Sequence, residues 1–452
     1  PEGCDLMVWR AVIACLCVAI GAARPGYAEA TDGDRVAALL DMRIVLAQLA
    51  VTAGTNDHLT IVRAQPQDKP QAIVLSKGVF HLSDISPQTV PDADLVQSDR
   101  MLVVGQPLVV MRDAELVLEP GDTIQLERET GAFLLNFGTI TAKGARIAGN
   151  GGVNPGAADF RPFVLTVGSG SIDLEASHMA SLGFGRSGNF AGLSIINKGL
   201  FPADAPSRLV GNTMRDLRSV VLENSKDSVV TGNLIGTSKS TALRLEGVVA
   251  ARVTENQILA SGRHGIRVTD ASKGVVLAGN TVTKSRGTSV LVDRRVSGLE
   301  ITKNTISEGA KGGVSLVGVS CAIVAQNTVT GVRQKGLSVR ASTDVRLDGN
   351  QLTGNGSDGI YVAEQAPDAV TVLTGNILTR NRSGLSGASA QNLILHGNDF
   401  SQQFPRILGG DLTARIETVA DDLTGERVLR IAPGQSVEVS AVPAPCTPKA
   451  GG

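Results

Sequence analysis

The residues best suited to acid–base chemistry lie close together in the middle of the chain. Arg244 and Arg267 occupy equivalent positions of two successive sequence repeats, and Glu246 follows Arg244 by two residues. His264 stands just before the second of these repeat strands. A guanidinium offsets the charge of a carboxylate, while a Glu or a His accepts a proton. The set suits proton transfer, with Arg244, Glu246 and His264 as catalytic candidates, or binding of an extended anionic or hydroxyl-rich polymer.

Further binding candidates follow along the same predicted face. Asp293 and Arg294 end the next repeat strand, and Arg340 lies two repeats further on. Tyr361 is four repeats from Arg267, about 19 Å at the ordinary spacing of strands, so the two cannot contact the same unit of a ligand. With Arg340, Tyr361 would instead form a separate subsite. A solvated strand face with paired charges explains the same pattern without any ligand.

A repeat of 21 to 26 residues positions all of these side chains. Each repeat carries an asparagine with an aliphatic residue three positions before it and an apolar residue two positions after it. A short run of alternating apolar and outward residues follows in most repeats. The asparagines are Asn212, Asn233, Asn256, Asn280, Asn304, Asn327, Asn350, Asn376 and Asn398.

Several short strands in every repeat, separated by Gly, Asn and Ser, predict one coil of a solenoid. The fold class is therefore all-β, a right-handed parallel β-helix with a small N-terminal cap. Coils stack at about 4.8 Å, the ordinary spacing of strands. We expect the asparagines to occupy left-handed turn positions and to bond to the amides of neighbouring coils. A leucine-rich repeat is the rival solenoid, but it requires Leu at fixed offsets and usually a helix in each repeat.

The sequence divides into four predicted segments. A helix over 34–50, capped at Asp32, is expected to close the end of the solenoid, and short strands are expected over 428–440. The segments are 1–30, a signal peptide; 31–100, an N-terminal cap and irregular segment; 101–405, the β-helix; and 406–452, C-terminal strands and tail.

The signal peptide is predicted from the thirteen mostly apolar residues Ala11 to Ala23, which follow Arg10 and precede a run of small residues. The apolar run is too short to span a bilayer, and no later stretch is long enough, so we expect a periplasmic protein without a membrane span. Cys321 and Cys446 remain after cleavage, and the sequence alone does not decide whether they form a disulfide.

Composition narrows the partners. Lys and Arg total 42 against 43 Asp and Glu, a balance that excludes a basic nucleic-acid surface. The only Trp precedes the predicted cleavage site, which disfavours a groove that holds neutral sugars by ring stacking. We expect a monomeric protein with no cofactor and no metal, and an extended anionic or hydroxyl-rich polymer as the ligand of the charged face. The glycines of residues 183–188 match a nucleotide-binding pattern but lack its strand and helix, so they are interpreted as a loop.

Four segments resemble the periplasmic mannuronan C5-epimerases of bacterial alginate biosynthesis. These segments are Arg161-Pro162-Phe163, Ser177-His178-Met179-Ala180-Ser181-Leu182-Gly183-Phe184, Val290-Leu291-Val292-Asp293-Arg294 and Ser357-Asp358-Gly359-Ile360. The resemblance covers roughly residues 100–400. It implies a β-helix that inverts C5 of mannuronate units within the polymer, with an Asp-Pro-His-Asp motif whose His is the base.

The chain departs from the family at that motif. The repeat aligns the motif with Leu243-Arg244-Leu245-Glu246, so Leu245 stands where the resemblance places the base. The Arg that the family uses one coil later to neutralise the substrate carboxylate aligns with Asp270, whereas Asp293 and Arg294 match. The resemblance therefore implies a divergent member that lacks the motif.

Three functions follow from these observations. The first is a C5-epimerase of an acidic, alginate-like exopolysaccharide with a rebuilt catalytic set. The second is a catalytically inactive protein that binds or escorts the polymer, as part of a periplasmic export complex. The third is a lyase or a glycosidase. A glycosidase would need two suitably spaced carboxylates, and a calcium-dependent lyase would need an acidic cluster.

Overall fold

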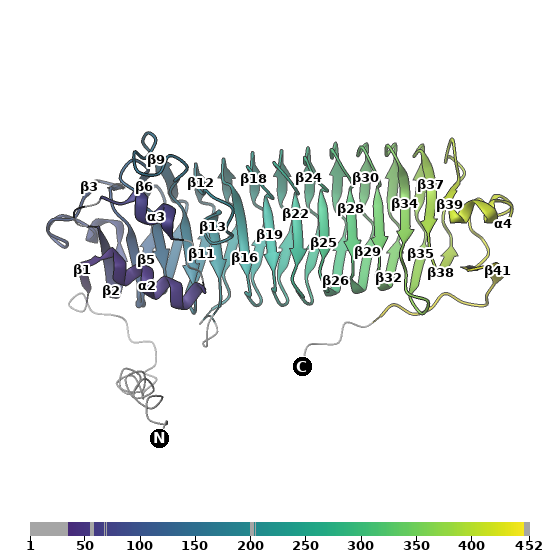
Figure 1. Ribbon diagram of the computed structural model, residues 1–452, viewed down its shortest axis with the longest axis horizontal. Coiled ribbons are helices and arrows are strands. Elements are labelled where there is room, and N and C mark those ends of the chain that lie inside the picture. Colours follow the sequence, from purple (N-terminus) through teal and green to yellow (C-terminus); the bar gives the residue numbers. More distant parts are fainter. Residues whose placement is uncertain are drawn as a thin grey trace, which may run out of the picture. The chain divides into compact units, whose positions relative to one another are not determined.

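The structure is a computed structural model that describes residues 35–54, 58–66, 68, 70–198, 203 and 205–446. The predicted signal peptide, 1–30, lies outside these residues. In the described part of the chain nearly all regular structure is β, arranged as a solenoid of about 13 turns (Figure 1). The predicted right-handed parallel β-helix is confirmed.

Each coil of the solenoid contributes strands to three faces, and equivalent strands of successive coils pair in parallel. The first face contains β7 (Leu134–Asn136), β10 (Val164–Val167), β13 (Gly192–Ile196), β16 (Ser219–Glu223), β19 (Leu243–Glu246), β22 (Ile266–Thr269), β25 (Val290–Asp293), β28 (Val314–Val317), β31 (Leu337–Arg340), β34 (Asp358–Ala363), β37 (Ser383–Ala388) and β39 (Leu408–Gly410). The second contains β8 (Thr139–Lys143), β11 (Ser171–Glu175), β14 (Arg208–Val210), β17 (Val229–Thr231), β20 (Arg252–Thr254), β23 (Val276–Ala278), β26 (Ser297–Thr302), β29 (Ser320–Ala325), β32 (Thr343–Asp348), β35 (Val370–Thr374) and β38 (Asn392–His396).

The third face is a sheet of thirteen strands, in which the hairpin β3–β4 is antiparallel and the later pairings are parallel. Inward aliphatic side chains of all three faces form one continuous core. The strands of the third face are β3 (Leu95–Ser98), β4 (Met101–Val104), β6 (Thr123–Glu127), β9 (Arg146–Asn150), β12 (His178–Ala180), β15 (Thr213–Arg215), β18 (Leu234–Gly236), β21 (Gln257–Leu259), β24 (Thr281–Thr283), β27 (Thr305–Ser307), β30 (Thr328–Thr330), β33 (Gln351–Thr353) and β36 (Ile377–Thr379).

The asparagine column forms a buried ladder. Asn280, for example, donates from Nδ2 to Oδ1 of Asn304 at 2.9 Å and to Val253 O at 2.9 Å, and its own Oδ1 accepts from Asn256. The predicted bonds between coils are therefore present. The predicted left-handed conformation was placed one residue too late, because the residue with positive φ precedes the asparagine, as at Gly279. A turn residue needs φ freedom, whereas the asparagine is chosen for its amide.

The N-terminal elements differ from the prediction in their start and position. Residues Val36–Asp41 form β1, antiparallel to β2 (Gln71–His81), and helix α2 (Met42–Ala53) begins only afterwards, with Asp41 rather than Asp32 accepting at its N-terminus. Helix α2 does not cap the end of the solenoid. Its buried side chains pack with those of α3 (Leu59–Ala64) on outward residues of the first coils, because those residues are apolar (Figure 1).

Parallel pairing also begins earlier than the predicted boundary at residue 101. Strand β2 pairs in parallel with β5 (Leu108–Leu118) and is followed by the short helix η1 (Leu82–Asp84). The apolar run that starts at Ala72 is buried on both sides, beneath α2 and against the core, so it lacks the alternation that marks the later strands.

The C-terminal segment folds back on the solenoid. After β39 come η2 (Asp411–Arg415), α4 (Ile416–Ala420) and the predicted terminal strands, β40 (Leu429–Ala432) and β41 (Gln435–Glu438). The tail beyond them runs back beside earlier coils (Figure 1). A disulfide joins Cys446 to Cys321 on β29, with Cα atoms 5.6 Å apart. The pair that the sequence left undecided is thus brought together.

Candidate functional site

The charged candidates stand on neighbouring coils of the first face, as the repeat predicts. Arg244 on β19 lies opposite Arg267 on β22, and Arg267 lies opposite Leu291 on β25. Side chains of this column before Arg244 are covered, since Val221 is completely buried. The accessible part of the first face therefore begins at Arg244 and continues toward the C-terminus.

Two ion pairs dominate this accessible part. Nε of Arg244 donates to Oε1 of Glu246 at 2.8 Å, and its Nη2 donates to the same oxygen. Nη2 of Arg267 donates to Asp293 at 2.8 Å, and the two side chains are 17% and 19% exposed. Both bonds from Arg244 end on one carboxylate oxygen, and the adjacent guanidinium makes Glu246 a weaker base than a free carboxylate. The pairs hold both guanidinium groups in place at the surface.

His264 is the candidate base that the geometry favours. Its Nδ1 lies 3.2 Å from Thr288 O; since a carbonyl only accepts, Nδ1 is assigned the hydrogen and Nε2 remains the acceptor. Burial is the main cause that lowers the pKa of His264 below its ordinary 6.5, and the charges of Arg263 and Arg267 lower it further. The hydrogen bond to Thr288 and the negative charge of Asp293 act in the opposite direction. The ring is therefore neutral near pH 7, as a base must be.

Leu245 faces away from any substrate. It is 0% exposed, packs in the core and lies opposite Val268 on the next strand. A base of a related protein must point outward, so the repeat-based alignment of Leu245 with that base is wrong by one residue. Since side chains alternate along a strand, the outward positions on this coil are Arg244 and Glu246.

The remaining predicted residues lie apart from His264. Arg294 pairs with Asp270 at 3.0 Å, so the residue that replaces the expected arginine is itself engaged by a neighbouring cation. Arg340 pairs with Glu364 at 2.6 Å.

Tyr361 lies one strand beyond the strand of Arg340, as predicted for a second subsite. The Nζ atom of Lys335, however, lies 3.4 Å from the centroid of the Tyr361 ring and occupies one of its faces. Lys335 itself was missed, because a lysine before a repeat strand has no distinctive sequence signal.

Sequence reasoning also missed a cationic group beside Arg244. Arg186 lies on the glycine-rich loop of residues 183–190, and Arg218 lies just before β16. The positive charges of Arg186 and Arg244 both lower the pKa of Arg218. The loop interpretation of those glycines is confirmed, since no helix follows them. What sequence could not supply is the contact of this loop with the first face, which joins residues distant in the chain.

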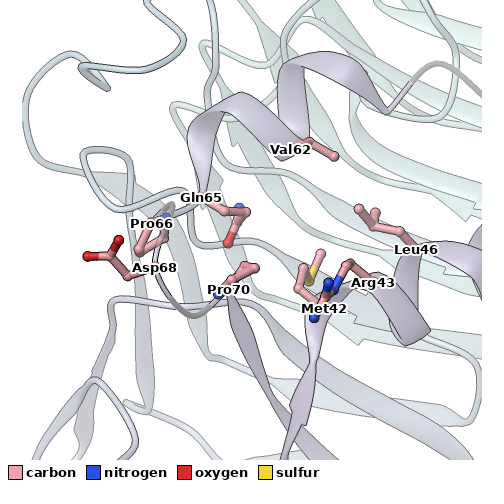
Figure 2. A pocket seen from close by; sticks show the side chains of 8 residues that line it. All are labelled: Met42, Arg43, Leu46, Val62, Gln65, Pro66, Asp68 and Pro70. Atoms are coloured by element: carbon pink, nitrogen blue, oxygen red, sulfur yellow. The ribbon is translucent and has the colours of Figure 1, made fainter.

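A pocket in the N-terminal region is separate from these residues. It has a volume of about 260 Å³ and lies between α2 and the segment after α3 (Figure 2). Its charged lining residues are Arg43 and Asp68, and Arg43 is already paired with Asp41 at 2.9 Å. None of the predicted site residues lines it.

The described residues contain no group of three or more His, Cys, Asp or Glu side chains placed to hold a metal ion. Among the same residues, no helix is both long enough and apolar enough to cross a bilayer.

Comparison with known proteins agrees with the resemblance. A family model described as a right handed beta helix region matches residues 241–400. A mannuronan C5-epimerase of Pseudomonas putida is 24% identical over 322 residues, which cover 65% of this chain and 59% of the relative. One of Pseudomonas aeruginosa is 29% identical over 152 residues, covering 32% and 27%. The chain thus matches less than two thirds of the length of either relative.

A crystal structure of the periplasmic alginate epimerase AlgG superposes with a TM-score of 0.66 at 20% identity, covering 86% of this chain and 99% of that one. This similarity shows a shared fold.

Proposed function

Starting from a right-handed β-helix that resembles the mannuronan C5-epimerases in sequence and in fold, we propose that the chain epimerises uronate units of an acidic, alginate-like polysaccharide. The observation that carries the proposal is the pairing of chemistries on one coil. His264 lies two residues before β22 and has a neutral ring, and Arg267 lies on that strand as a cation paired with Asp293. The positive charge of Arg267 acts on the His264 ring, which places the base and the cation near each other on this coil.

The chain's residues divide the reaction between them. Nε2 of His264 removes the proton from C5, and the electron pair of the C–H bond moves into the adjacent carboxylate. Arg267, joined by Arg244 on the preceding coil, offsets the charge that develops on the carboxylate oxygens. A proton from solvent then adds at C5 on the opposite face of the ring. No atom is lost or gained, and the configuration at C5 is inverted.

Deuterium exchange tests this proposal. The protein is incubated with polymannuronate in deuterated water, and both deuterium at C5 and guluronate content are measured by NMR. Epimerisation predicts that the two rise together. Exchange and guluronate both absent, with a properly folded protein, would contradict an epimerase.

A second candidate function is binding or escort of the polymer without catalysis. The ion pair of Arg244 and Glu246 favours it, because an adjacent cation makes a carboxylate a weaker base. Binding requires only that carboxylates of the polymer exchange with or bridge these ion pairs. On this proposal the protein would hand the polymer on within an export complex.

Loss of the two arginines should weaken binding in either case. The double variant Arg244→Gln and Arg267→Gln is expected to bind polymannuronate at least about 10-fold more weakly, since charged hydrogen bonds contribute roughly 1.5–3 kcal/mol each. Isothermal titration measures this. The control Arg252→Gln removes an exposed arginine from the second face and should bind as the parent does. Equal binding by all three proteins would remove this face from consideration.

A lyase or glycosidase is the least supported function. Glu223 and Glu246 lie on adjacent strands in register, but Glu223 is paired with Lys198 and Glu246 with Arg244. A glycosidase needs one carboxyl that is protonated and one that is free. Neither requirement fits a pair in which both members are held by cations.

The disulfide supports a periplasmic location, which we propose together with a monomeric state. Structural disulfides persist in oxidising compartments and are rare in the cytosol. Protein recovered from the periplasm is expected to show no free thiol at Cys321 or Cys446 on labelling under denaturing conditions. After reduction, the tail that ends at Cys446 should be cleaved faster by protease. Two free thiols in periplasmic protein would contradict the location argument.

A further inference from the structure

The glycine-rich loop of residues 183–190 is a fixed wall on the first face. The rings of Phe184 and Phe190 stack with centroids 5.3 Å apart, and Phe184 N donates to Phe190 O at 2.9 Å. Oγ of Ser194, on β13, donates to Gly188 O at 2.7 Å. These contacts anchor both ends and the middle of the loop. The aromatic rings belong to the cluster that also holds α2 and α3.

Arg244 lies directly beside this wall. A Cβ atom added at Gly188 would be 3.7 Å from Nη1 of Arg244 and 3.7 Å from Cγ1 of Val221. The loop therefore covers Val221 and leaves the guanidinium of Arg244 at its edge. The two distances are ordinary van der Waals distances, so the guanidinium packs against the loop at position 188.

Two more arginines are held next to Arg244. Arg186 projects from the loop itself and is exposed. The backbone of Arg218 is fixed between two neighbouring turns, since its N donates to Leu182 O and its O accepts from Ser240 N, each at 3.0 Å. Arg218 is thus placed between the loop and the coil that carries Arg244.

The charges of this group are not balanced within the protein. Burial, followed by the positive charges of Arg186 and Arg244, lowers the pKa of Arg218 below its ordinary value. Among the described residues no carboxylate lies within ion-pair distance of Arg186 or Arg218, and Glu246 pairs with Arg244 alone. Three cations with one carboxylate leave a net positive site, which a bound anion would stabilise.

We propose that Arg186, Arg218 and Arg244 form an anion subsite that binds the carboxylate of a uronate unit. The identification of the anion as a uronate rests on the proposed function; the cationic site itself does not. Because the loop covers the coils before β19, this is the last subsite of the accessible face on the N-terminal side. A polymer that reaches it must end or turn away there, while Arg267 one coil further engages a neighbouring unit.

The test uses the double variant Arg186→Gln and Arg218→Gln, which leaves Arg244 and Arg267 intact. Its affinity for a mannuronate oligomer is measured by isothermal titration, beside the same oligomer with its carboxyl groups reduced to alcohols. We expect affinity for the charged oligomer to fall at least about 10-fold, with a weaker dependence on salt. Binding of the reduced oligomer should not change. Arg215→Gln, an exposed arginine on β15, is the matched control.

The outcomes separate the subsite from the proposed function. If the parent protein binds mannuronate oligomers and the double variant binds them equally well, with an unchanged melting temperature, the subsite is refuted. If the parent ignores mannuronate but binds polygalacturonate, and the double variant loses that binding, the subsite stands and the alginate-like substrate falls. If the parent binds neither polyuronate, both proposals are overturned.

Discussion

Replacing His264 by alanine is expected to lower the rate of C5 exchange by at least about 100-fold, the usual contribution of a general base. His264 donates one side-chain hydrogen bond, to Thr288 O, and is 9% exposed, so the melting temperature of the variant is measured beside its rate. The matched control is His178→Ala, which removes an exposed histidine from β12 on the third face. Unchanged exchange in the His264 variant would remove this residue from the mechanism and direct the search to Glu246.

The pH profile of the parent protein provides a second readout for His264. A base acts in its unprotonated form, so the rate should fall as pH drops through the pKa of His264. Burial lowers that pKa below 6.5, against the opposing effects of Asp293 and the bond to Thr288. The acidic limb should therefore lie below pH 6.5. A limb above pH 6.5 would contradict His264 as the base.

The fold could be predicted from the sequence because the repeated residues each have one structural role in every coil. An asparagine every 21 to 26 residues and alternating apolar positions specify stacked coils directly, and the two outward columns follow from them. Prediction was weaker where the pattern is broken by contacts with other elements. Helix α2 was assigned to the end of the solenoid, although apolar outward residues of the first coils receive it.

The site was predicted in part for the same reason. Register along the repeat placed Arg244 beside Arg267 correctly, since strand pairing fixes it. Alignment of Leu245 with the base of related proteins failed, because a shift of one residue exchanges the inner and outer faces of a strand. Arg186 and Arg218 were missed because a loop far away in sequence brings them to Arg244, and no local pattern encodes that contact.

The asparagine ladder is expected to contribute measurably to stability, and Asn280→Ala tests this. The change removes four buried hydrogen bonds: from Nδ2 to Val253 O and to Asn304, and to Oδ1 from N and Nδ2 of Asn256. At about 1 kcal/mol each, the free energy of unfolding should fall by about 4 kcal/mol, measured by denaturant titration.

The control for the ladder is Asn150→Ala, at an exposed asparagine at the end of β9, whose removal should change stability by less than about 0.5 kcal/mol. A ladder variant that is as stable as this control would mean that water replaces the lost amide. That outcome is disfavoured by geometry, because Asn280 is 0% exposed and is enclosed by Asn256 and Asn304 on the adjacent coils. Donors and acceptors that lose their partner there cannot bond to water instead. The substitution therefore destabilises the hydrogen bonds of both neighbouring coils.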